Sequence, residues 1–212
     1  MDPAAIARSF VDEEEVRAVQ RGHLRHFRGA RRVLDLGCGR GTFLGLLREA
    51  GIEGLGVDRD PAPARAAGHE VVEGEVEAFL HGAAARGERF DGVFASHLVE
   101  HLPADHVPGL VERIAAVLSP GGRVVLVTPN ARNLVVLTET FWLDPTHVRP
   151  WPRPLLGRLG EAAGLRVIES YDDRATLPRR SFPRRLLARI RSVLSGADRS
   201  GPMDSVVVMG RP

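Results

Sequence analysis

An acidic side chain precedes a glycine-rich turn near the start of the chain. Residues 33–43 read V-L-D-L-G-C-G-R-G-T-F, so Asp35 is followed by Gly37, Gly39 and Gly41. An apolar strand that enters a helix through glycines is typical of nucleotide-binding turns, because glycines let the backbone approach a ligand. The G-x-G-x-G spacing differs from the G-x-G-x-x-G of dinucleotide sites, and the carboxylate would repel a diphosphate. It would attract an amine or a sulfonium, which favours S-adenosylmethionine over NAD or ATP.

Four later segments resemble, in order, the remaining motifs of class I methyltransferases, the family whose first motif the glycine turn matches. They are G-L-G-V-D at 54–58, V-V-E-G-E at 71–75, F-D-G-V-F-A-S at 90–96 and L-S-P-G-G-R-V-V-L-V-T at 118–128. The resemblance implies that Asp58 holds the ribose hydroxyls and that Glu75 contacts the adenine amino group. The full set of residues predicted to bind S-adenosylmethionine is Asp35, Gly37, Cys38, Gly39, Asp58, Glu75 and His97.

The same segments predict the fold. Strands and helices alternate up to residue 128, and the right-handed crossover rule arranges such a series as a doubly wound parallel sheet. The β-branched runs at 165–171 and 205–209 would add the sixth and seventh strands, and the family's last strand is antiparallel. We therefore expect an α/β, Rossmann-like methyltransferase fold with a mostly parallel seven-stranded sheet.

One domain accounts for the length of the chain. With 212 residues and 43% hydrophobic content, the chain can bury one α/β core but is short for two typical domains. Within a single domain of residues 1–212 we expect four parts. They are an N-terminal helical cap at 1–30, a cofactor-binding core at 31–129, an acceptor loop and helix at 130–164 and a basic insertion at 174–204. Helical spacing at 12–27 predicts the helix of the cap.

The bulk composition excludes several classes of function. All 29 basic residues are arginine, and the absence of lysine removes Schiff-base chemistry. A net charge of +2 is too small to indicate bulk binding of nucleic acid. No apolar stretch is long enough to span a bilayer and the start M-D-P-A-A-I-A has no signal-peptide pattern, so we expect a cytoplasmic protein. The single Cys38 fits a reducing compartment, and we expect it to pack rather than react.

A histidine pair follows the fourth expected strand, where the family's pocket opens toward the sulfonium. Methyl transfer to a hydroxyl needs a positioned acceptor and a base that works near neutral pH, which favours histidine. In H-L-V-E-H at 97–101, His101 is a candidate for handling the acceptor proton with Glu100 as its partner. The alternative is that the pair merely ends the loop after the strand.

Glu100 and His101 also resemble part of a metal site. Small-RNA 2′-O-methyltransferases and some quinone O-methyltransferases carry E-x-x-E-H and a later histidine, which bind a divalent ion. By this resemblance, a divalent metal would be held by Glu100, His101 and His147. His97 replaces the first acid of the motif, and an imidazole there would favour a borderline ion over Mg²⁺.

A second candidate segment, F-W-L-D-P-T-H-V-R-P, occupies residues 141–150. It resembles a D-P-T-H-x-R-P segment that follows the fifth strand in bacterial methyltransferases of polysaccharide and O-antigen pathways. The resemblance predicts that His147 faces the acceptor and that Arg149 holds a phosphate or carboxylate through its planar fork. The alternative is a structural turn that Asp144 and Thr146 cap.

Together these segments predict an enzyme that methylates a hydroxyl of a sugar or glycan precursor, with His101, His147 and Arg149 as its catalytic residues. One alternative is O-methylation of a quinone, polyketide or other small phenolic hydroxyl. Another is a noncatalytic S-adenosylmethionine-binding module that docks on RNA or on a protein partner.

A basic amphipathic helix is predicted from Pro183 to Leu194, where arginines alternate with leucine, isoleucine and valine. Such a helix can pack on the sheet, bind RNA or lie on an anionic membrane surface. Peripheral contact with the inner membrane surface would suit a lipid-linked acceptor, whereas nucleic acid is the less expected partner. The sequence leaves the oligomeric state open.

Overall fold

A seven-stranded sheet forms the centre of the computed structural model, which describes residues 12–177 and 201–212. The strand order is β3-β2-β1-β4-β5-β7-β6. The strands are β1 (Arg32–Leu36), β2 (Glu53–Asp58), β3 (Val71–Glu73), β4 (Phe90–Ser96), β5 (Leu118–Pro129), β6 (Arg166–Asp172) and β7 (Asp204–Gly210). Only β7 runs against the others, between β5 and β6. The predicted doubly wound, mostly parallel sheet with an antiparallel last strand is confirmed.

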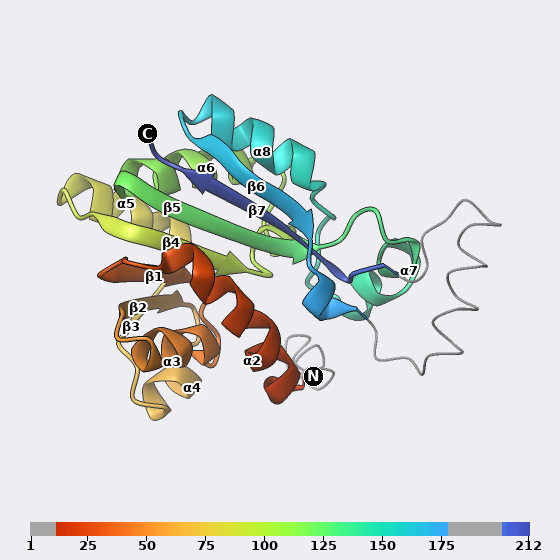
Figure 1. Ribbon diagram of the computed structural model, residues 1–212, viewed down its shortest axis with the longest axis horizontal. Coiled ribbons are helices and arrows are strands. Elements are labelled where there is room, and N and C mark those ends of the chain that lie inside the picture. Colours follow the sequence, from red (N-terminus) through yellow and green to blue (C-terminus); the bar gives the residue numbers. More distant parts are fainter. Residues whose placement is uncertain (1–11, 178–200) are drawn as a thin grey trace.

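Helices cover both faces of this sheet (Figure 1). One face carries α5 (Val76–Ala85), α6 (His106–Val117) and α8 (Arg153–Ala162). The other face carries α2 (Glu13–Arg21), the 3₁₀ helix η1 (Gly22–Phe27), α3 (Thr42–Glu49) and α4 (Ala62–Ala66). This arrangement is the one that right-handed β-α-β crossovers in both directions from β1 produce.

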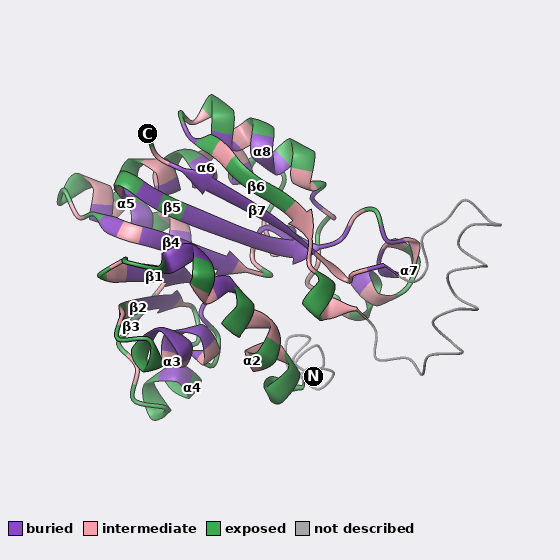
Figure 2. Ribbon diagram, viewed as in Figure 1, coloured by how far each residue is buried: buried purple, intermediate pink, exposed green. Residues whose placement is uncertain are grey.

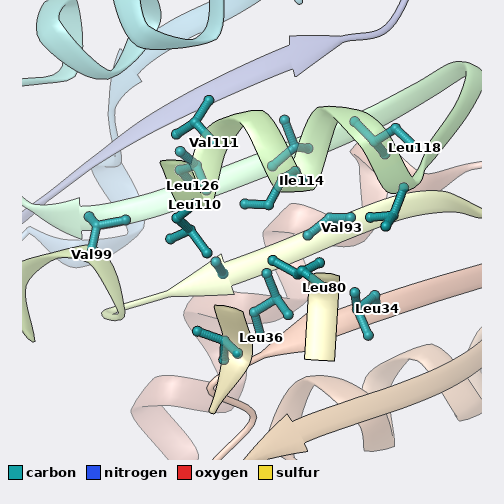
Figure 3. Packing of buried hydrophobic residues seen from close by; sticks show 14 of the residues in the cluster. Leu34, Leu36, Leu80, Val93, Val99, Leu110, Val111, Ile114, Leu118 and Leu126 are labelled. Carbon is teal, nitrogen blue, oxygen red and sulfur yellow. The ribbon is translucent and has the colours of Figure 1, made fainter. Parts of the chain in front are cut away.

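Side chains that alternate along the strands build two separate apolar layers. Figure 2 shows that β5 and β7 are buried along most of their length, whereas the outer sides of the helices are exposed. In Figure 3, Leu34, Leu36 and Val93 of the strands meet Leu80 of α5 and Leu110 of α6. Because successive strand residues point to opposite faces, Val33 joins the other layer, beneath α3 and η1.

The N-terminal cap is an α-helix that continues as a 3₁₀ helix before it reaches the sheet. Asp12 caps α2 by accepting the main-chain N–H groups of Glu14 and Glu15, and η1 continues to Phe27. The helix predicted over 12–27 is therefore present, with a 3₁₀ second half. Phe27 packs directly on Gly92 of β4, where a Cβ atom would lie 2.4 Å from the phenylalanine ring. The absence of a side chain at this position lets the cap reach the sheet.

The segment after β5 is only partly an irregular loop. It contains α7 (Leu134–Thr138), which Asn133 caps, and the 3₁₀ helix η3 (Thr140–Leu143). Two further 3₁₀ helices, η2 (Val99–His101) and η4 (Arg174–Thr176), follow β4 and β6. The predicted basic helix at 183–194 lies outside the described residues. Within 12–177 and 201–212, no helix has the length and apolar character needed to cross a membrane.

Candidate active site

The predicted site residues meet at one edge of the sheet. The carboxyl ends of the parallel strands lie there, and because β7 is antiparallel, its amino end lies there too. Asp35 on β1 pairs with Gly56 on β2 and Phe94 on β4, so residues at the ends of these three strands are neighbours. In open α/β sheets this edge is where ligands bind.

The glycine turn presents open backbone at this edge. Gly37, Gly39 and Gly41 have φ angles of 70°, 52° and 77°, a region that favours glycine. The Gly37 N–H donates to the Val57 carbonyl at 2.8 Å, which ties the turn to β2. A Cβ atom at Gly39 would meet nothing within 4 Å. The exposed backbone at Gly39 therefore fits a ligand that approaches closely, as the sequence predicts for S-adenosylmethionine.

Asp58 at the end of β2 holds the turn in place. Its Oδ2 accepts the Gly39 N–H at 2.8 Å, and its Oδ1 accepts the Asp60 N–H at 2.9 Å. Each carboxylate oxygen has a second lone pair, so both can also accept a ribose hydroxyl. Glu75 lies at the N-terminus of α5, where its exposed side chain makes no capping bond. Its reach toward an adenine amino group stays a prediction.

Asp35 and Cys38 lie beneath the turn. Asp35 is only 3% exposed, and burial together with the nearby Asp58 carboxylate raises its pKa to about 8. The Cys38 thiol is buried against β2, where a Cβ atom at Gly56 would lie 2.6 Å from its sulfur. Burial, followed by the charges of Asp35 and Asp58, raises the pKa of the Cys38 thiol. A buried protonated thiol packs rather than reacts, as expected.

Binding of S-adenosylmethionine is expected to release a proton near pH 7. With a pKa of about 8, Asp35 is mostly protonated in the free protein at that pH, and the cationic end of the cofactor would ionise it. Cofactor affinity should therefore rise as the pH increases toward about 8 and then level off. Calorimetry in two buffers with different ionisation heats measures the released proton. Equal heats in both buffers would contradict this role for Asp35, and Asp35→Asn should remove any difference.

The same carboxyl group also links folding to pH. In the unfolded chain Asp35 ionises at about pH 4, whereas the folded protein keeps its proton up to about pH 8. The folded state therefore binds more protons in this window. As a result, the contribution of Asp35 to the free energy of unfolding falls as the pH rises through it.

His97 occupies a strained position directly after β4. Its φ angle of 53° is the only positive value of a non-glycine residue within the described ranges. Its Nδ1 lies 3.0 Å from Glu100 Oε1 and its Nε2 lies 3.5 Å from Asp204 Oδ1. Partial desolvation in the pocket wall lowers its pKa, but the Asp204 and Glu100 carboxylates outweigh this effect and raise the pKa of His97 well above its usual range. Strained backbone of this kind is concentrated at functional sites.

Hydrogen bonds determine which ring nitrogen of His101 carries the proton. Thr146 Oγ1 donates to Asp144 Oδ1 at 2.6 Å, so it must accept from His101 Nδ1, which lies 2.8 Å away. The lone pair of neutral His101 is therefore at Nε2. Burial lowers the pKa of His101 and so favours this neutral form.

His147 is oriented in the same way by a different partner. Its Nδ1 lies 2.6 Å from the carbonyl oxygen of Phe141, which only accepts, so its lone pair is also at Nε2. The ring centres of His101 and His147 are 4.6 Å apart.

A capped turn lies between the two histidines. Thr146 also donates its main-chain N–H to Asp144 Oδ1 at 2.8 Å. Residues 141–150 thus contain the structural turn, capped by Asp144 and Thr146, that the sequence analysis gave as the alternative. This turn brings the two histidines together.

Glu100 anchors this turn to β5. Its carbonyl oxygen accepts the Val148 N–H at 2.8 Å, and its fully buried carboxylate accepts the Thr128 hydroxyl at 3.3 Å. Ligand atoms of Glu100, His101 and His147 lie within 4.8 Å of one another. Two imidazoles and one carboxylate are donors suited to a borderline divalent ion, which these three residues would hold. The ion stays a prediction, because Glu100 also faces His97.

A cavity of about 160 Å³ opens beside these residues. Its apolar walls are Pro129, Val136, Phe141 and Met203, and its polar groups are His97, Thr140, His147 and Asp204. His101 is not a lining residue, but its ring packs against that of His147, which is one. We call it the acceptor pocket.

Arg149, the third predicted catalytic residue, does not line the acceptor pocket. Its exposed guanidinium lies 4.6 Å above the ring of buried Trp151, a cation–π contact. Asp204, in contrast, was not predicted from the sequence. Its role depends on the insertion of β7 beside β5, and no local pattern indicates that placement.

The sequence matches the family described as "Methyltransferase domain" over residues 8–170. The match covers more than half of the chain, so the protein belongs to this family. A solved S-adenosylmethionine-dependent methyltransferase from Archaeoglobus fulgidus is 28% identical, with a TM-score of 0.75 over 94% of this chain and 95% of that one. The chain accordingly contains a methyltransferase domain with the fold of S-adenosylmethionine-dependent methyltransferases.

Curated relatives add information about acceptors. A ubiquinone biosynthesis O-methyltransferase of Methylobacterium nodulans is 31% identical over 155 residues, which are 65% of this chain and 61% of the relative. The enzyme of that name from Aeromonas salmonicida is 28% identical over 65% of this chain and 63% of its own length. The match thus spans about three fifths of these relatives.

A more distant structure shares the fold. It is the 1,6-didemethyltoxoflavin-N1-methyltransferase of Burkholderia thailandensis with bound S-adenosylhomocysteine, at 20% identity and a TM-score of 0.66 over 96% of this chain and 80% of that one.

Proposed function

We propose that the protein methylates a phenolic or quinol-type hydroxyl of a small molecule bound in the acceptor pocket. The observation that carries this proposal is the composition of the pocket, in which the Nε2 atom of His147 accompanies walls of Phe141, Val136, Pro129 and Met203. Half of the lining side chains are apolar and can pack on an aromatic ring, and the other half are polar and can bind its hydroxyl. Relatives named as ubiquinone biosynthesis O-methyltransferases support the same class of acceptor.

The sugar or glycan-precursor hydroxyl that the D-P-T-H-V-R-P segment predicts has less support. Arg149, which was expected to hold an acidic group of that acceptor, stacks on Trp151 and is not a lining residue. A sugar acceptor stays a prediction, and it is one arm of the test below.

The residues of the acceptor pocket have different roles in methyl transfer. The chemistry that S-adenosylmethionine supplies when bound is an electrophilic methyl group on its sulfonium. With no ion bound to His147, its Nε2 accepts the proton of the acceptor hydroxyl, and the Phe141 carbonyl holds the ring in position through Nδ1. His97, held between Asp204 and Glu100, forms a fixed part of the pocket wall beside the acceptor.

A panel of acceptors tests the proposal. The protein is incubated with S-adenosylmethionine labelled on its methyl group and with catechol, hydroquinone, methyl glucoside or a UDP-sugar. We expect label on the two phenolic probes and none on the two sugars. Labelled sugar with unlabelled phenols would show that the proposed acceptor class is wrong. Repeating the assay with a chelator tests the predicted metal, because a required ion would make the loss of turnover reversible by added Zn²⁺ or Mn²⁺.

A further inference from the structure

The described part of the chain contains another buried histidine, far from the sequence motifs. His23 lies on η1, with 1% of its surface exposed, and its ring centre is 5.8 Å from that of Phe94 on β4. Neither ring nitrogen makes a hydrogen bond to any residue in 12–177 or 201–212. A buried polar group without hydrogen bonds destabilises the folded state, so an apolar side chain would serve packing better at this position.

The neighbouring His26 shows what a structural histidine looks like in this cap. It is also buried on η1, and its Nε2 lies 3.1 Å from the Tyr171 hydroxyl, within hydrogen-bonding distance. His23 differs, because the polar group that it faces is a carboxylate. Its Nε2 lies 3.4 Å from Oδ2 of Asp173.

Asp173 is itself firmly held. Its Oδ1 accepts the Ala175 N–H at 3.0 Å and so caps η4. Its main-chain carbonyl accepts both the N–H and the hydroxyl of Thr176. With one oxygen fixed in the cap, the other is aimed at His23. The contact between them joins the N-terminal cap to the end of β6.

Asp173 is also joined to the acceptor pocket. Its main-chain N–H donates to the carbonyl of Asp204 at 2.8 Å, and Thr176 Oγ1 accepts the Asp204 N–H at 3.0 Å. The Asp204 side chain in turn faces His97. A continuous series of contacts therefore runs from His23 through Asp173 and Asp204 to His97.

We propose that His23 is a positioning residue of the transfer reaction, which acts through Asp173 to hold the Asp204 carboxylate against His97 in the acceptor pocket. The inference rests on the proposed function, because it assigns the pocket to the acceptor. His97 needs such support, since its backbone is strained and its exposed fraction is 44%. Displacing a group in the pocket wall by about 1 Å is enough to cost up to roughly 100-fold in rate.

Matched variants separate positioning from packing. His23→Phe keeps a ring of similar size in an apolar site but loses the contact with Asp173. His26→Phe makes the same change next to it, outside this series of contacts. Asp173→Asn, with an amide oxygen that can still cap η4, breaks the contact from the other side and guards against a folding defect in His23→Phe.

The first measurement needs no acceptor. Long-range ¹H–¹⁵N spectra of histidine-labelled protein with S-adenosylmethionine report the ring of His97. We expect His23→Phe and Asp173→Asn to move the His97 nitrogen signals, His26→Phe to leave them in place, and His23→Gln, which restores a donor toward Asp173, to bring them part of the way back. Unmoved His97 signals in both His23→Phe and Asp173→Asn, or an equal shift in His26→Phe, would overturn the proposal.

The second measurement is turnover on catechol. We expect kcat to fall roughly tenfold or more in His23→Phe and Asp173→Asn, with KM for S-adenosylmethionine unchanged. An unchanged kcat in both variants would overturn the proposal. If the unaltered protein labels no phenol, the proposed function fails, and the spectra alone then decide the role of His23.

Discussion

Replacing His147 by glutamine is expected to slow methyl transfer by about 10²- to 10⁴-fold, the range that a positioned general base contributes. Glutamine preserves much of the volume beside Phe141 but offers no nitrogen lone pair that accepts a proton. His147 lies in the acceptor pocket, away from the glycine turn, so affinity for S-adenosylmethionine should stay unchanged. Turnover on catechol and calorimetry with S-adenosylmethionine provide the two measurements.

His81→Gln is the matched control for this variant. His81 is exposed on α5, on a helix that contributes no lining residue to the acceptor pocket, so its replacement should leave both quantities unchanged. Full turnover in His147→Gln would show that another group takes the proton. His101, whose ring contacts His147 and whose lone pair is also at Nε2, would then be the next candidate.

Replacing Asp58 by alanine is expected to weaken S-adenosylmethionine binding by at least about 100-fold. Two ribose hydroxyls would lose a charged acceptor, and hydrogen bonds to charged groups contribute about 1.5–3 kcal/mol each. The glycine turn would also lose the Oδ2 atom that holds the Gly39 N–H. Calorimetry measures the affinity, and circular dichroism checks that the variant is folded.

Two companion variants sharpen this result. Asp58→Asn keeps an oxygen for one of the main-chain N–H groups, so its affinity should fall between those of Asp58→Ala and the unaltered protein. Glu73→Ala removes a neighbouring acid at the end of β3, where it pairs with Arg65, and should bind normally. An unchanged affinity in Asp58→Ala would remove this residue from the cofactor site.

The strands of the core could be predicted because each is a short local pattern. An apolar run that ends in an acid or a glycine, as at Asp35 and Asp58, can be recognised within a few residues. In a parallel sheet the ends of all such runs lie at the same edge. The right-handed crossover rule then predicted the parallel part of the sheet, and the resemblance to class I methyltransferases predicted the antiparallel last strand.

The rest of the pocket depends on contacts between distant segments. Asp204 reaches His97 only because β7 inserts between β5 and β6, and Asp173 meets His23 only because the cap lies across the sheet. The guanidinium of Arg149, which the sequence predicts to hold an anion, also lies over the ring of Trp151, two residues later. Residue type and spacing do not specify these tertiary partners.

The late position of β7 has a consequence for the order in which the protein becomes competent during synthesis. Every strand that carries the predicted cofactor residues precedes Asp204 in the chain, whereas the pocket wall is finished only when Asp204–Gly210 inserts between two strands already made. Long-range pairing of this kind forms slowly. A nascent chain emerging from the ribosome is therefore expected to form the strands of the predicted cofactor site before the pocket wall that contains Asp204.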